Sequence, residues 1–225
     1  MIYKFLPLIL FCAFSFKPLN TADLEKNVIS NTDPKLIASN AKVALETKCK
    51  TFYTTIDANN LSLPKFDSFF AAFQGYEQLK AQGKITNEIL TVIDFSLSSI
   101  EERMWVIDMK TQKVILKSLV AHGRNSGVEF ATNFSNENES YKSSLGFYLT
   151  GEVYQGKHGL SLRLDGMEYG INDKARDRAV VIHGADYVSK KLARAQGYIG
   201  RSQGCPAVPY EVHKKLIETI KDKSC

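Results

Sequence analysis

A cysteine and a histidine, each beside a glycine, are the residues of this chain best suited to chemistry. Cys205 lies in segment 200–206, which reads GRSQGCP, and His183 follows the apolar run at 180–182. A thiol attacks a carbonyl only as its thiolate. A histidine within hydrogen-bond reach can take the thiol proton and later protonate a leaving amine. Together the two residues predict a thiol-dependent acyl-transfer enzyme.

The residues around the cysteine can supply the rest of such a site. Attack on a carbonyl forms a tetrahedral oxyanion, which backbone N–H donors stabilise. We expect the N–H of Cys205 to be one donor, joined by that of Gly204 or Gln203, because Gly204 lets the backbone approach a substrate. Ser202 either orients the site through its hydroxyl or forms a turn. The histidine precedes the cysteine in the chain, which differs from the order in papain-like proteases.

The elements that must position these residues are mainly strands, with helices before and after them. The chain has 225 residues, 44% of them hydrophobic, enough for one large domain or a domain with a helical appendage. Helical spacing predicts a weak helix over 34–48 and a stronger one after Pro64, which Gly83 can end. Another helix is expected after Pro209.

Between these helices, apolar and polar residues alternate as they do in strands. The expected strands cover residues 91–97, 104–109, 114–120, 146–150, 160–164 and 179–182. Segment 130–144 is rich in Asn, Ser and Glu and is expected to be an exposed loop. The fold class is therefore mainly β with flanking helices, an α+β arrangement. The aromatic stripe after Pro64 is expected to pack in the core rather than bind a ligand.

The N-terminal segment predicts export. Lys4 precedes an apolar run too short to span a bilayer comfortably, so we expect residues 1–18 to be a signal peptide or N-terminal anchor and 19–33 a linker. No stable membrane span is expected after processing. An oxidising compartment would favour a disulfide between Cys49 and Cys225, with Cys205 free. Two unpaired structural cysteines are the alternative.

Charge and ligand patterns argue against other classes of protein. The net charge is +5, but Lys and Arg are scattered among Asp and Glu, so nucleic acid is not an expected partner. His122 and His158 have no His-Glu-x-x-His, Cys-x-x-Cys or clustered carboxylates near them, so we expect no metal and no cofactor. No coiled-coil or repeat pattern indicates an oligomer.

Over about residues 65–215 the sequence resembles the L,D-transpeptidases of bacterial cell walls. That family has a His-Gly phrase, matched by His183-Gly184, and then a Ser/Thr-His-Gly-Cys phrase, matched by residues 202–205 except at Gln203. The usual Cys-x-Arg is replaced by Cys-Pro-Ala. These departures, with the phrases at 122–127 and 156–162, are similar to the divergent branch called the murein L,D-transpeptidase catalytic domain family.

The resemblance implies a β-sandwich catalytic domain over 89–225, with a helical segment at 34–88 packed on it. It implies that Cys205 attacks the third residue of a peptidoglycan stem peptide, with loss of D-alanine and formation of an acyl-enzyme. His183 would be the base and then the acid, and a second stem would resolve the acyl-enzyme into a 3–3 cross-link. Export would place the protein in the periplasm or cell envelope. The candidates for substrate contacts are Arg201, Ser202, Gln203, His122 and Arg163.

Two alternatives share these residues. The same acyl-enzyme could end in hydrolysis, which would make the protein an L,D-carboxypeptidase or endopeptidase. The missing family histidine and arginine also leave open a catalytically silent module that binds the cell wall.

Overall fold

The computed structural model describes residues 34–225, so the expected signal segment and linker lie outside the described residues. The helices are α2 (Pro34–Thr55), α3 (Phe66–Ala81), α4 (Lys190–Gln196) and α5 (Tyr210–Ile220). The strands are β1 (Ile89–Ile93), β2 (Met104–Asp108), β3 (Lys113–Ser118), β4 (Tyr148–Gly156), β5 (Gly159–Gly166), β6 (Val181–Gly184) and β7 (Ala207–Val208). This is the expected α+β composition.

The chain divides into two compact units, one ending at Ala44 and the other covering Leu45–Cys225. All candidate site residues lie in the second unit, which is the one considered below. None of the helices in the described part of the chain has the length and apolar character that a membrane crossing requires.

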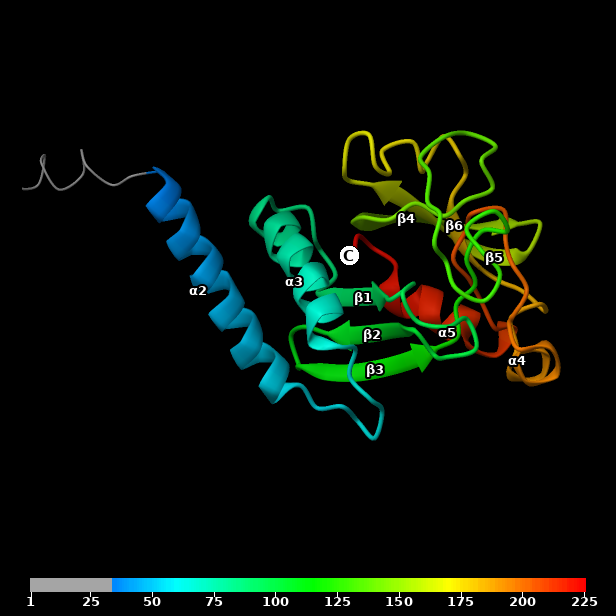
Figure 1. The fold of residues 1–225 in the computed structure, drawn as a ribbon, viewed down its shortest axis with the longest axis horizontal. Helices are drawn as coiled ribbons and strands as arrows, with labels where there is room; N and C mark the ends of the chain where they lie inside the picture. Colours follow the sequence, from blue (N-terminus) through cyan, green and yellow to red (C-terminus); the bar gives the residue numbers. More distant parts are fainter. Residues whose placement is uncertain (1–33) are drawn as a thin grey trace, which may run out of the picture. The chain divides into compact units, whose positions relative to one another are not determined.

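The strands form two sheets in the described region (Figure 1). One is the antiparallel meander β1-β2-β3. The other has the order β4-β5-β6-β7, in which the first three strands pair antiparallel and β7 joins β6 in parallel. The parallel pair is the exception; it carries His183, and Cys205 lies in the bend just before β7.

Helix α5 packs between the two sheets and supplies the centre of the core (Figure 1). Its residues Leu216, Ile217 and Ile220 are fully buried. They meet alternate residues of β1 and β2 on one side and of β5 and β6 on the other, including Leu162 and Ile182. Full burial of a side chain of this size contributes roughly 1.5–3 kcal/mol. The apolar face expected after Pro209 is therefore confirmed.

Helix α3 covers the opposite face of the meander (Figure 1). Phe69, Phe73 and Tyr76 are buried there against strand residues such as Leu90 and Trp105. The aromatic stripe is thus a core element, as expected. The helix ends where Gly83 takes a left-handed conformation, with φ of 67°, a backbone region that glycine enters without strain.

The last residues of the chain connect the two sheets. The Cys225 N–H donates to the Ile89 carbonyl (3.2 Å), and the Thr91 N–H donates to the Cys225 carbonyl (2.8 Å). Next to it, the Ser224 N–H donates to Thr150 Oγ1 of β4 (2.9 Å). One short segment therefore binds β1 and β4 at once.

The expected Cys49–Cys225 disulfide is not formed. Both residues are free thiols, although both pack into the cluster beneath α3. Burial raises the pKa of Cys49 to about 11 and that of Cys225 to about 12. Each acts here as a small apolar side chain, which is common for buried free cysteines.

The contact between α3 and the loop before β4 gives a test of the fold. A Cβ added at Gly75 would lie 2.2 Å from Phe147 Cδ1. We predict that Gly75→Ala lowers the free energy of unfolding by about 1–3 kcal/mol through overpacking. This loss should appear although alanine favours a helix by about 0.8–1 kcal/mol over glycine. Denaturant titration measures the change.

The double variant Gly75→Ala, Phe147→Ala is the control, because it removes the ring that the new methyl group meets. In that background the substitution at position 75 should become neutral or stabilising. An equal loss in both backgrounds would contradict the proposed clash.

Candidate active site

Strand β6 carries the candidate base, and the candidate nucleophile lies in the bend just before its neighbour β7. The two strands pair in parallel, with His183 opposite Ala207. Cys205 lies two residues before Ala207, in the bend that leads into β7. The Val181 N–H, two residues before His183 on β6, donates to the sulfur of Cys205. Cys205 therefore lies beside the start of the strand that carries His183.

The turn that precedes β6 surrounds the sulfur of Cys205. The thiol contacts the Ala179 carbonyl oxygen at 3.7 Å, and the Val181 N–H donates to the sulfur. Ala179 has φ of 53°, in the left-handed region that alanine seldom occupies. Such conformations gather at functional sites because surrounding structure must enforce them. Here the unusual backbone points a carbonyl at the thiol.

The imidazole of His183 is held in one tautomer. Its Nδ1 lies 2.9 Å from the Gly184 carbonyl oxygen, so Nδ1 carries the proton and donates it there. Nε2 has no hydrogen-bond partner among the described residues, which leaves its lone pair to accept a proton. The group that orients the candidate base is thus the backbone carbonyl of Gly184. Sequence reasoning found the His-Gly phrase but did not assign this role to the glycine.

Gly184 is also required by packing. A Cβ at this position would lie 2.5 Å from Tyr210 Cδ1 and 3.0 Å from His213 Cγ. The start of α5 therefore presses directly against the residue that orients the candidate base.

Burial acts on both candidate catalytic groups in the direction of the neutral form. It raises the pKa of the Cys205 thiol, an effect partly offset by the Val181 N–H and by the Arg178 guanidinium. Burial also lowers the pKa of His183. The Gly184 hydrogen bond opposes that shift, and nearby His158 and His213 add to it. The resting pair is therefore a neutral thiol and a neutral imidazole, which suits general-base attack.

The loop before Cys205 (residues 199–204), called the nucleophile loop below, is held in place by the hydroxyl of its own Ser202. Ser202 Oγ accepts the Gly204 N–H at 3.0 Å and donates to the Cys205 carbonyl at 2.6 Å. Ser143 Oγ, from the loop at 130–144, donates to the Gly204 carbonyl at 3.0 Å. Gly204 has φ of 125°, which favours glycine.

These bonds correct two expectations. The Gly204 N–H is already used within the loop, which leaves the N–H groups of Cys205 and Gln203 as the expected oxyanion donors. Ser202 is buried with both of its hydrogen bonds inside the loop, so it forms a turn and does not face a substrate.

His122 is likewise a brace and not a substrate contact, because only 1% of its surface is exposed. Arg103 Nη2 lies 2.7 Å from His122 Nδ1, and His122 Nε2 lies 3.3 Å from the Gly127 carbonyl. The backbone carbonyl of His122 accepts the Ser202 N–H at 3.0 Å. Arg103 is itself fully buried and donates to the carbonyls of Val120 and Leu97. Arg103 and His122 therefore support the nucleophile loop from within the core.

The other expected substrate contacts remain near the site. Gln203 is exposed, and Arg201 is partly exposed, with Nη1 donating to the Gly127 carbonyl at 3.2 Å. Arg163 lies on β5 directly opposite Val181, so it shares the face of the sheet that carries His183. Its guanidinium stacks 4.6 Å from the centre of the Tyr154 ring.

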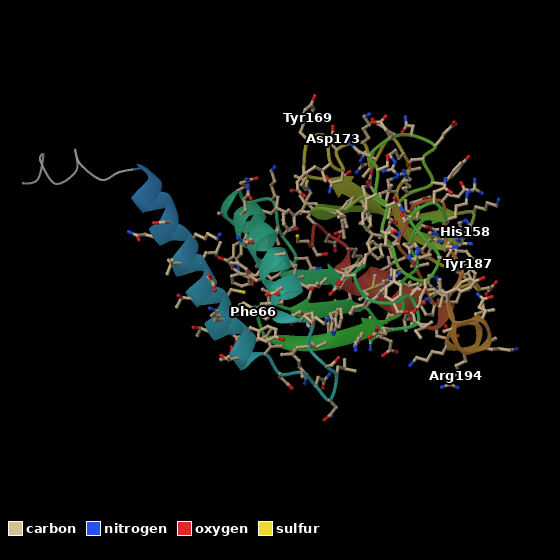
Figure 2. All side chains as sticks on the ribbon, in the orientation of Figure 1. Phe66, His158, Tyr169, Asp173, Tyr187 and Arg194 are labelled. Carbon is tan, nitrogen blue, oxygen red and sulfur yellow. The ribbon has the colours of Figure 1, made fainter. Side chains whose placement is uncertain are left out.

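Two further residues, His158 and Tyr187, lie at the site. The His158 ring stacks on the His183 ring at 4.5 Å and lines a cavity of about 530 Å³ with Tyr210, His213 and Lys214. Tyr187 lies near the sulfur; burial, followed by the Cys205 thiolate charge, raises its pKa to about 12. Figure 2 shows His158 and Tyr187 at the same end of the domain, away from Phe66. His158 lies in the phrase at 156–162 noted in the sequence, whereas no motif marks Tyr187.

In the region covered by the structure, no group of three or more His, Cys, Asp or Glu side chains is placed to hold a metal ion.

Comparison with models of protein families matches residues 60–225 to the L,D-transpeptidase catalytic domain. The matched region begins before α3 and includes both sheets. No curated protein and no solved structure matches the chain.

The buried imidazole of His122 predicts a pH-dependent stability. Burial first, and then the Arg103 charge, lowers its pKa from 6.5 to about 4. As the pH falls below 6.5, His122 becomes protonated in the unfolded chain but stays neutral in the folded protein. The stabilising effect is therefore complete above pH 6.5 and is lost as the pH falls towards 4. The loss should be roughly 3 kcal/mol.

Denaturant unfolding of the wild type and of His122→Asn between pH 4 and 7.5 measures this contribution. The asparagine keeps a polar side chain but cannot titrate, so its stability should fall less steeply in this window. Parallel curves for the two proteins would show that His122 does not contribute.

Proposed function

The chain belongs to the L,D-transpeptidase catalytic domain family, and on that premise we propose that Cys205 and His183 transfer acyl groups of peptidoglycan stem peptides. The observation that supports the proposal is that Cys205 contacts the start of β6, two residues from His183, whose Nδ1 is bound and whose Nε2 is free. A nucleophile, a base and a carbonyl that orients the base are the parts that acyl transfer needs.

In the first half-reaction, His183 Nε2 takes the thiol proton as the sulfur attacks the carbonyl of the third stem residue. The Cys205 N–H stabilises the oxyanion. When the tetrahedral intermediate collapses, the carbon–nitrogen bond breaks and the imidazolium protonates the departing D-alanine amine. The products are D-alanine and a thioester on Cys205.

In the second half-reaction, the side-chain amine of another stem attacks the thioester and His183 takes the amine proton. The carbon–sulfur bond breaks, a new amide forms, and the proton returns to the thiolate. The product is a 3–3 cross-link. Water in place of the amine would give a shortened stem instead.

Arg163 and Arg201 are the proposed contacts for stem carboxylates, since guanidinium groups bind carboxylates in a bidentate manner. Arg163 is the better placed of the two, because it lies on the face that carries His183. The substrate is a cell-wall polymer, so we also propose that the protein is exported.

The central test incubates the protein with a disaccharide-tetrapeptide and follows products by mass. The wild type should release one alanine per event, and a carbapenem should add covalently to Cys205. Cys205→Ala should lose both signals. His183→Asn should slow turnover by about 10²–10⁴-fold. Cys225→Ala removes a thiol outside the site and should stay active.

The products decide between the related activities. Dimers indicate transfer, and trimmed monomers indicate hydrolysis. Unchanged substrate together with no carbapenem adduct would refute catalysis and favour a module that binds the wall.

The pH dependence of kcat/KM provides a second test. The acid limb should fall below pH 6.5, because the pKa of His183 is lowered and its neutral form is the base. The alkaline limb should lie above pH 9.0, because the pKa of Cys205 is raised. Both limbs belong to the coupled pair. An acid limb above pH 6.5 would contradict attack by a neutral pair.

A further inference from the structure

We infer that Arg178 is a positioning residue for the nucleophile, whose uncompensated positive charge favours the thiolate of Cys205. The inference rests on the proposed role of Cys205 as the nucleophile. The turn before β6 thus supplies a positive charge that neither Cys205 nor His183 provides in the resting state.

Arg178 lies near the end of the same turn that surrounds the sulfur. The next residue, Ala179, places its carbonyl 3.7 Å from the thiol, and the Val181 N–H donates to the sulfur. The guanidinium itself reaches the nucleophile loop, since Nη2 would lie 3.4 Å from a Cβ added at Gly204. The charge, the carbonyl and the N–H thus come from four consecutive residues.

The guanidinium is held by neutral oxygens. Nη1 donates to the Ser135 carbonyl (2.7 Å) and to Ser144 Oγ (3.1 Å). Nη2 donates to the Lys142 carbonyl (2.6 Å) and to Ser140 Oγ (3.4 Å). No carboxylate forms an ion pair with Arg178 among the described residues.

An arginine fixed by dipoles keeps its full charge, and in a partly buried site that charge is weakly screened. Arg176, two residues earlier, shows the contrast: it pairs with Glu152 and Asp165 at the surface. The acidic groups that act on Arg178 are Tyr148, Cys205 and Glu137, and Glu137 is already paired with Lys174. The Cys205 thiolate is therefore a natural counter-charge.

The other groups near the thiol do not replace this charge. Tyr187, from the loop before α4, stays a neutral phenol because its pKa is raised to about 12. His183, on β6, is neutral in the resting state because its pKa is lowered. Arg178 is the cation whose charge lowers the pKa of Cys205 against the larger effect of burial.

Alkylation of Cys205 by iodoacetamide across a range of pH tests the inference without any peptidoglycan substrate. Mass mapping follows Cys205 separately from the other thiols. We expect Arg178→Gln to move the midpoint of alkylation up by about 0.5–1 pH unit. At pH 7 alkylation should slow by about 3–10-fold. Arg178→Lys keeps the charge and should recover part of the shift.

Two controls separate the charge from the structure of the loop. Ser144→Ala removes one hydrogen bond of Arg178 but no charge, and Arg176→Gln removes a neighbouring charge that is already paired. Both should leave the midpoint in place. A shift in Ser144→Ala as large as that in Arg178→Gln would overturn the electrostatic role, and so would no shift in a folded Arg178→Gln protein.

The outcome of the alkylation experiment does not depend on whether the proposed reaction takes place. If alanine release fails while the alkylation shift appears, the function proposed above is wrong and the role of Arg178 stands. If the wild type releases alanine and Arg178→Gln leaves the midpoint unchanged, the role of Arg178 fails alone.

Discussion

The parallel pairing of β6 with β7 is the contact on which the candidate site depends, because it holds the segment that contains Cys205 beside the strand that carries His183. It consists of only two residue pairs. Its stability comes from its neighbours: the Ala121 N–H donates to Ala207, and a bridge joins Gly123 to Ser202. Arg103 and His122 then support that bridge from within the core. A short strand is kept in register by the loop packed beside it.

Burial gives this site its chemical character. It disfavours the charged forms of both Cys205 and His183, and the polar groups left around them act in a medium that screens little. A single carbonyl then suffices to fix the tautomer of His183. Because screening is low, the positive charge of Arg178 acts on the thiol of Cys205, since only neutral oxygens bind the guanidinium. The protein thus combines desolvated reactive groups with fixed dipoles, and this arrangement favours charge that develops only during reaction.

The sequence predicted the elements with strong periodicity and the residues with distinctive chemistry. The aromatic helix, the helix after Pro209 and strands β2 and β3 follow directly from apolar spacing. The first strand was expected over 91–97 but spans Ile89–Ile93, because the chain turns at 95–97. Strand β7 was missed because two residues carry no period, and α4 was missed because it is a short helix. His122 looked like a site residue, since sequence shows a polar type but not its burial. Arg178 was missed because its role depends on loop residues 135–144, which are distant in the chain.

The bonds that brace the nucleophile loop join segments far apart in the chain: Ser143 to Gly204, and Ser99 to Ile199. Contacts of such long range are slow to form, because the intervening chain must first be ordered. Cys205 therefore acquires its activating surroundings only when folding is almost complete. Until then its thiol has no aligned base and no cation beside it. An incompletely folded chain would carry an ordinary cysteine, and the reactivity of that cysteine would arise together with the final fold.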